Sequence, residues 1–125
     1  MAKTSALILF AHGARATSWA VPFQRLQTML REQLADTPVE LAFLELMEPS
    51  LSDVVVRLVQ QGCTQISVVP VFLGQGGHVS RDLPAVVDTL RSTYPALQLG
   101  VAGAVGENPA VLAAIAAYCR STLAE

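Results

Sequence analysis

The chain is poor in charged, aromatic, cysteine and histidine residues, and these shortages exclude several functions. Only 14% of the 125 residues are charged, the net charge is −2, and Lys and Arg form no run. Nucleic acid is therefore an unsuitable partner, because it would need a basic surface. No apolar stretch reaches the roughly 20 residues of a membrane-spanning helix, and no secretory signal is recognisable. We expect a cytoplasmic protein without membrane contact.

What the chain does have is apolar sequence. Hydrophobic residues make up 52%, and the mean hydropathy is +0.46. A buried parallel sheet explains this composition, and so does a large interface with a second copy. The length predicts one domain over residues 1–125. The two cysteines, Cys63 and Cys119, lack CxxC spacing and are expected to be buried free thiols.

Apolar runs alternate with segments of helical periodicity along the whole chain. Strands are predicted at Ser5–Ala11, Val39–Leu46, Gln65–Phe72 and Leu97–Ala102, with helices at about 18–35, 50–62, 80–92 and from 108 onward. Short connections and right-handed crossovers then predict an α/β fold. We expect a single doubly wound, four-stranded parallel sheet with helices on both faces, comparable to half of a larger flavodoxin-like protein.

Polar residues and prolines refine this prediction. Four residues are expected to cap the helix starts: Ser18, Ser50, Ser80 and Asn108. Pro70 cannot donate to a sheet ladder, so it suggests an edge strand or a bulge. The last helix is expected to turn one apolar face inward through Val111, Leu112, Ile115 and Cys119.

The only two histidines both follow apolar strands. His12 comes directly after the first predicted strand, and His78 ends the glycine-rich loop after the third. The carboxyl ends of parallel strands share one edge, where α/β proteins bind ligands. Two imidazoles at that edge predict a metal site or an acid–base pair. The alternative for each histidine is a structural hydrogen-bonding role.

Three charged residues extend this constellation. Glu45 lies near the end of the second strand, where it could complete the site or cap a helix from the rim. Two imidazoles and one carboxylate, with positions left open, are typical of catalytic sites for metals such as iron, nickel, zinc and cobalt. Arg15 and Arg81 each follow a histidine by three residues. They could bind carboxylates or phosphates, or remain solvated at the surface.

Three blocks carry a family resemblance. Residues 7–15, 42–51 and 69–84 resemble, in this order, the motifs of the CbiX/SirB group of class II tetrapyrrole chelatases, in its short single-domain form. The third block is the most specific. The chain departs from the family's GHGSR motif at Ala11 and Ala14, where glycine and serine are usual.

The resemblance implies insertion of cobalt(II) or ferrous iron into sirohydrochlorin, on the route to cobalamin or sirohaem, or of nickel into a related tetrapyrrole. It implies a homodimer, and a divalent metal that is substrate rather than permanent cofactor. It also implies that His12 and His78 face the metal, with Glu45 as their acidic partner.

The substrate carboxylates would then be received by Arg15, Arg81 and the helix start at Ser80. Two alternatives stay open from the sequence. One is a non-catalytic protein that binds metal or tetrapyrrole on the chelatase scaffold, and the other is flavodoxin-like nucleotide binding.

Overall fold

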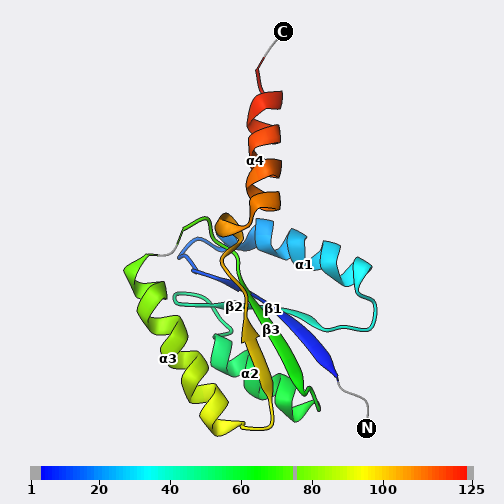
Figure 1. The fold of residues 1–125 in the computed structure, drawn as a ribbon, viewed down its shortest axis with the longest axis vertical. Helices are drawn as coiled ribbons and strands as arrows, with labels where there is room; N and C mark the ends of the chain where they lie inside the picture. The colour runs from blue at the N-terminus through cyan, green and yellow to red at the C-terminus, as the bar shows by residue number, and fades with distance from the viewer. Residues whose placement is uncertain (1–3, 75, 124–125) are drawn as a thin grey trace.

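The computed structural model describes residues 4–74 and 76–123, apart from the side chains of residues 77–80. Strands and helices alternate over these residues (Figure 1). The elements are β1 (Ser5–Ala11), η1 (Thr17–Ala20), α1 (Val21–Gln33), β2 (Val39–Phe43), α2 (Leu51–Gln60), β3 (Gln65–Pro70), α3 (Gly77–Thr93), β4 (Gln98–Val101), η2 (Val105–Glu107) and α4 (Pro109–Ser121).

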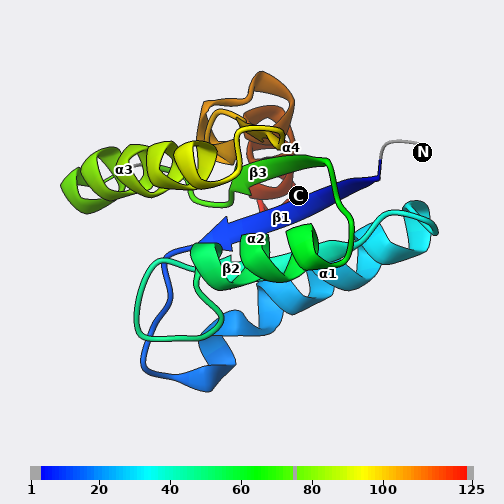
Figure 2. The same cartoon turned by 90° about the horizontal axis from the view of Figure 1, so that it is seen from below.

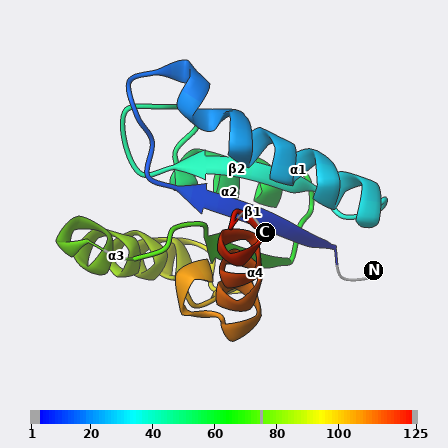
Figure 3. The same cartoon turned by 90° about the horizontal axis from the view of Figure 1, so that it is seen from above.

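The four strands found in the described residues form one sheet in the order β2-β1-β3-β4. All neighbouring strands are parallel. Helices lie on both sides, and Figures 2 and 3 show α1 and α3 on opposite faces. The predicted α/β fold with a doubly wound parallel sheet is therefore confirmed.

The main core lies between the sheet and the helices α2 and α3. Ile8 and Val68 from the strands and Val54, Val55 and Leu58 from α2 have no more than a trace of exposure. A smaller cluster beneath the start of α1 contains Ala11, Ala20 and Phe43. Strands buried on both faces explain the near-continuous apolar runs of the sequence.

The edge strands are β2 and β4, and arginines bind a backbone carbonyl on each. Arg31 of α1 donates to the Val39 oxygen at 3.1 Å, and Arg91 of α3 donates to the Leu99 oxygen at 2.7 and 3.1 Å. Edge carbonyls otherwise offer a template for pairing with another chain. Arg31 and Arg91 therefore each occupy a carbonyl on one edge strand of the sheet.

Three strands end earlier than predicted, and β4 differs least, with one residue lost at each end. β2 stops at Phe43 because the chain bends, and Leu46 takes a positive φ of 66°. β3 stops at Pro70 and is a central strand, so an edge position for this proline is wrong. The Val71 N–H donates to the Phe10 oxygen of β1. Neighbouring residues of a strand direct their nitrogens to opposite sides, so the Pro70 nitrogen faces the β4 side. At that level β4 has already ended, because its last residue is Val101. The missing donor therefore costs no ladder bond.

Two of the four predicted caps are confirmed. The Ser50 hydroxyl accepts from the Asp53 N–H at 3.1 Å, and the Asn108 side chain accepts from two N–H groups at the start of α4. Ser18 lies inside η1 and does not cap α1. The prediction for Ser80 is wrong, because α3 begins at Gly77 with Gly76 as its N-cap.

The prediction for the last helix is also wrong. None of the residues of α4 is buried, and Figure 1 shows the helix rising away from the sheet. Cys119 is consequently exposed, whereas Cys63 is buried as expected, and burial raises the pKa of its thiol. Among the described residues, no helix combines the length and apolar character needed to cross a bilayer.

Candidate functional site

Strand order brings three chain segments together at the carboxyl edge of the sheet. β1 lies between β2 and β3, so the chain moves to one side of β1 after its first crossover and to the other side later. Ligands of open α/β sheets bind beside such a switch point. His12 directly follows β1 and therefore lies at this position. The segments after β2 and β3 flank it.

The segment after β2 is bonded to the segment that carries His12. Beyond the strands, the Leu44 N–H donates to the Ala11 oxygen at 2.9 Å, and the Glu45 N–H donates to the His12 oxygen at 3.0 Å. Gly13 makes this approach possible. Its φ is +94°, and a Cβ there would lie 1.8 Å from the Glu45 carbonyl oxygen. Only glycine fits this position without a shift of the backbone.

The segment after β3 contacts the His12 ring. The rings of His12 and Phe72 have centroids 5.1 Å apart, and Phe72 packs edge-on to Phe10 at 6.3 Å. Val71 also donates to the Phe10 oxygen at 2.8 Å, which ties this loop to β1. The sequence reasoning missed Phe72. The only sequence signal for Phe72 was its place in the third block, five residues before the start of the helix that carries His78.

The structure describes the predicted site residues to different extents. Glu45 is exposed in the loop after β2, with its backbone beside His12. His78 and Ser80 lie in the first turn of α3, and their side chains fall outside the described part of the structure. No group of three acidic, histidine or cysteine side chains that could hold a metal occurs among the described residues. The proposed ligand set of His12, His78 and Glu45 therefore stays a prediction.

One of the two predicted arginines, Arg15, lines a cleft on the β2 side of the site. The cleft has a volume of about 350 Å³, and its walls include Ala14, Arg15, Gln24, Phe43 and Glu48. The Arg15 side chain is exposed and lines this cleft. Arg81 is exposed on α3 and lies outside this cleft.

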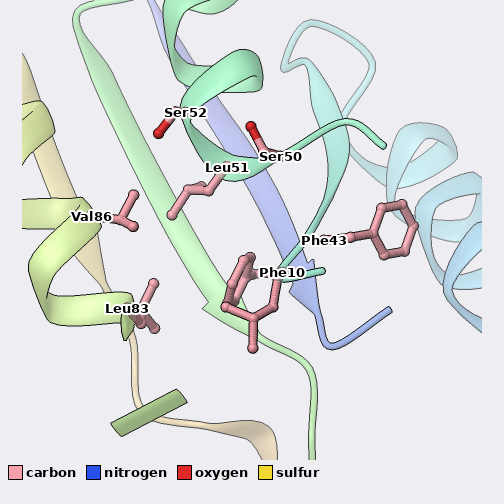
Figure 4. A pocket seen from close by; sticks show the side chains of 8 residues that line it. Phe10, Phe43, Ser50, Leu51, Ser52, Leu83 and Val86 are labelled. Carbon is pink, nitrogen blue, oxygen red and sulfur yellow. The ribbon is translucent and has the colours of Figure 1, made fainter. Parts of the chain in front are cut away.

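A small apolar pocket lies between the starts of α2 and α3 (Figure 4). Its volume is about 70 Å³, and its walls include Phe10, Leu51, Leu83 and Val86, with the Ser50 and Ser52 hydroxyls at the α2 end. Phe43 lines both this pocket and the cleft of Arg15. The two hollows thus flank the end of β2, where the chain continues to Glu45.

Sequence comparison identifies relatives of this chain. The family model described as CbiX matches residues 6–122. A sirohydrochlorin cobaltochelatase from Methanocaldococcus jannaschii is 32% identical over 89 residues, which are 71% of this chain and 62% of that protein. The chain therefore matches less than two thirds of the length of this curated relative.

Solved structures share the fold. A protein named as a CbiX protein of cobalamin (vitamin B12) biosynthesis, from Marinobacter aquaeolei, has a TM-score of 0.81 and 32% identity, over 94% of this chain and 95% of that one. The sirohydrochlorin chelatase SirB from Bacillus subtilis subspecies spizizenii, solved with cobalt, has a TM-score of 0.79 and 24% identity, over 95% of this chain and 51% of that one. The likeness to SirB concerns the fold alone, within a chain about twice as long. By the match over residues 6–122 and by its fold, this chain belongs to the CbiX family.

Proposed function

We propose that this protein inserts a divalent metal, cobalt(II) or ferrous iron, into sirohydrochlorin or a closely related tetrapyrrole. The observation that carries the proposal is the meeting of three strand ends around His12. The backbone of Glu45 is bonded on one side and Phe72 packs on the other. Membership of the CbiX family supports the same reaction class.

The reaction sets clear chemical demands. A divalent ion enters the macrocycle, four pyrrole nitrogens bind it, and two pyrrole protons must leave to a base. The metal must be held weakly enough to be released. A neutral imidazole nitrogen can ligate such a metal or accept a proton, so histidine suits both demands. The metal is a substrate here, and the proposal includes no permanent cofactor.

We assign the roles accordingly. His12 and His78 bind the incoming metal or accept the pyrrole protons, and Glu45 orients one imidazole or relays its proton. The contact between the His12 and Phe72 rings limits the rotation of the imidazole, which favours a fixed direction for its nitrogens. The backbone bond from the Glu45 N–H to the His12 oxygen keeps the two residues adjacent, which supports a relay role for Glu45.

The carboxylates of the tetrapyrrole need cationic or N–H partners. Arg15 is exposed in a cleft beside this edge, and Arg81 is exposed in the second turn of α3. The first turn of α3 carries Ser80, and free N–H groups at a helix start attract anions. We assign these three residues to binding of the substrate carboxylates. Residues 1–125 are proposed to form one domain that works as a homodimer.

A metal-by-metal assay tests the proposal. Purified protein is mixed with sirohydrochlorin and cobalt(II), nickel(II) or, without oxygen, ferrous iron, and the absorbance of the macrocycle is followed. Catalysis requires many turnovers per protein, faster than the mixture without protein. Stoichiometric binding with no acceleration would contradict it and would favour the non-catalytic binder, which the departure at Ala14 also suggests.

Variants test the residue roles. Either His12→Ala or His78→Ala is expected to lower the metallation rate about 100-fold or more, because a ligand or a proton acceptor is lost. Glu45→Gln keeps the shape of the side chain and removes its charge. Its matched control is Glu32→Gln on α1, an exposed carboxylate away from this edge. Full activity of both histidine variants would refute the assignment, as would equal effects of the two glutamine substitutions.

A further inference from the structure

Two large apolar side chains are exposed at the edge of the sheet that carries His12. Leu46 is 59% exposed in the segment after β2, and Leu73 is 66% exposed in the segment after β3. Each directly follows a residue that contacts His12. The Glu45 N–H donates to the His12 oxygen, and the Phe72 ring lies against the imidazole. Because β1 lies between β2 and β3, the two leucines flank the candidate site from opposite sides.

The backbone of Leu46 has a conformation that leucine rarely adopts. Its φ is 66°, in the left-handed region that glycine, asparagine and aspartate enter far more readily. Bonds on both sides of the residue hold it there: the Glu45 N–H donates to the His12 oxygen, and the Phe43 N–H donates to the Pro49 oxygen at 2.9 Å. A glycine would avoid the strain, and a polar side chain would avoid the exposed apolar surface. Backbone strain of this kind gathers at functional sites.

The backbone of Leu73 is also held in place, although its side chain is exposed. In η2, the Gly106 N–H donates to the Phe72 oxygen at 3.2 Å. A Cβ at Gly106 would lie 1.9 Å from the Leu73 oxygen, so η2 packs directly against this part of the loop. Neither Leu46 nor Leu73 is part of the core clusters that the described residues form. Both apolar side chains are therefore carried on a fixed backbone and are accessible to a ligand.

Leu46 shares its cleft with charged residues of both signs. Leu46, Met47 and Phe43 line the cleft together with Arg15 and Glu48. One cation and one anion leave the cleft without a net charge, so a ligand cannot be held there by charge alone. Apolar walls beside one guanidinium suit an apolar molecule that carries a carboxylate at its edge. A tetrapyrrole has this composition, because its apolar macrocycle is surrounded by carboxylate side chains.

We propose that Leu46 and Leu73 are positioning residues for the macrocycle. Their side chains contact its apolar surface and hold it over His12, while Arg15 binds a carboxylate at its edge. This inference rests on the proposed function and adds the residues that orient the ring. The strain at Leu46 then has a reason, because the left-handed backbone turns an apolar side chain toward the substrate instead of the core. Such contacts bind the substrate and the transition state about equally, so they act on KM more than on kcat.

Binding of sirohydrochlorin without any metal tests the proposal directly. The absorbance of the macrocycle is followed as protein is added, so no turnover is needed. Leu46→Ala and Leu73→Ala are each expected to raise the dissociation constant about 5- to 10-fold, because most of a leucine side chain is no longer buried by the ring. Met29→Ala is the matched control, since Met29 is 55% exposed on α1, and it should bind like the wild type. Unchanged binding by both leucine variants would overturn the proposal.

Leu46→Gly separates a role in binding from a role in folding. Glycine relieves the strain of the left-handed backbone, so the midpoint of urea unfolding should be kept or raised. The apolar contact is lost, so the dissociation constant should rise as in Leu46→Ala, whereas Leu46→Met should bind almost like the wild type. A glycine variant that binds sirohydrochlorin as tightly as the wild type would show that the leucine serves only the loop. All three variants should keep the sedimentation coefficient of the wild type, and a change would mean that a second chain, not the substrate, covers Leu46.

Kinetics and salt distinguish this inference from the chelatase proposal. In the metallation assay, Leu46→Ala should raise KM about 5- to 10-fold and leave kcat within about two-fold, in contrast to the loss of rate expected for the histidine variants. Its effect on binding should be the same at low and high salt, whereas that of Arg15→Gln should shrink as salt screens the charge. Binding without turnover in the wild type would refute the chelatase proposal alone. A wild type that binds no sirohydrochlorin would refute both.

Discussion

The two halves of one sheet face are completed in different ways. Over β1 and β2, α1 lies on the sheet, and Leu9, Ala11 and Phe43 are almost inaccessible. Over β3 and β4, the corresponding face carries exposed Ser67 and Gly100, and the helix that follows β4 extends away. Both halves belong to the same parallel sheet, so the sheet itself does not cause the difference.

The difference lies in the connections. The chain enters α1 through η1, where Trp19 packs on Phe23 with ring centroids 4.6 Å apart and also approaches Phe43 of β2 at 6.5 Å. These aromatic contacts hold the start of α1 against the sheet. The chain enters α4 through η2, whose contacts are with the loop after β3. A short connection can thus decide whether an apolar helix covers its own sheet.

Matched leucine truncations should show the largest contrast between the two halves. Leu58 of α2 is fully buried, whereas Leu112 of α4 is 47% exposed. Leu58→Ala should lower the free energy of unfolding by about 3 kcal/mol, through lost burial and a cavity. Leu112→Ala should change it by less than about 0.5 kcal/mol in protein dilute enough to be monomeric. Urea unfolding measures both, and equal losses would place α4 in the core of the single chain.

Two glycines make the second contrast. Gly13→Ala introduces a Cβ into the Glu45 carbonyl at a φ of +94°, and it should cost about 2 kcal/mol or more. Gly100→Ala meets open space in the strand, and it should raise the stability of the monomer by up to about 1 kcal/mol. Thermal unfolding of dilute samples decides the comparison. A tolerated alanine at position 13 would argue against the close approach of the two loops.

Helix caps provide a smaller test with the same chemistry in both regions. Ser50→Ala removes the cap of the buried helix α2 and should lower the free energy of unfolding by about 1 kcal/mol. Asn108→Ala removes the cap of α4. In a dilute monomer it should leave global unfolding unchanged and only speed hydrogen exchange in α4. A global loss from Asn108→Ala would mean that α4 unfolds together with the core.

The cysteines provide the smallest contrast. Burial raises the pKa of Cys63, so the folded state keeps the thiol proton at a pH where the unfolded chain loses it. Its contribution to stability is complete below pH 9.0, the ordinary value, and declines as the pH rises further. Cys63→Ala should weaken this alkaline decline, and Cys119→Ala should not. Exposed Cys119 should also react with a maleimide well before Cys63.

Sequence patterns were reliable where one local interaction decides the outcome. Apolar runs predicted β1 at its observed bounds, and the capping patterns at Ser50 and Asn108 were right. They failed where two segments compete. Ser80 has the chemistry of a cap, yet α3 starts at Gly77, because a glycine-rich segment can enter the helix before the serine is reached. Pro70 is tolerated in a central strand only because β4 is short.

The candidate site shows the same division. Strand-end positions predicted that His12 and the segment of Glu45 meet at one edge, and the backbone bond between them agrees. The contact of Phe72 with the His12 ring could not be predicted, since it depends on how the loop after β3 folds back on β1. The side-chain positions of His78 and Ser80 remain predictions.

The sequence by itself determined the α/β class, the parallel sheet and the edge at which the chemistry is expected, because periodicity and strand ends are local properties. The family blocks are equally local, since each is a run of neighbouring residues. Only the tertiary structure decided that α1 covers the sheet and that α4 does not. The apolar face of a helix does not specify which surface the helix will cover. That choice depends on the geometry of η1 and η2, the connections through which the chain enters α1 and α4.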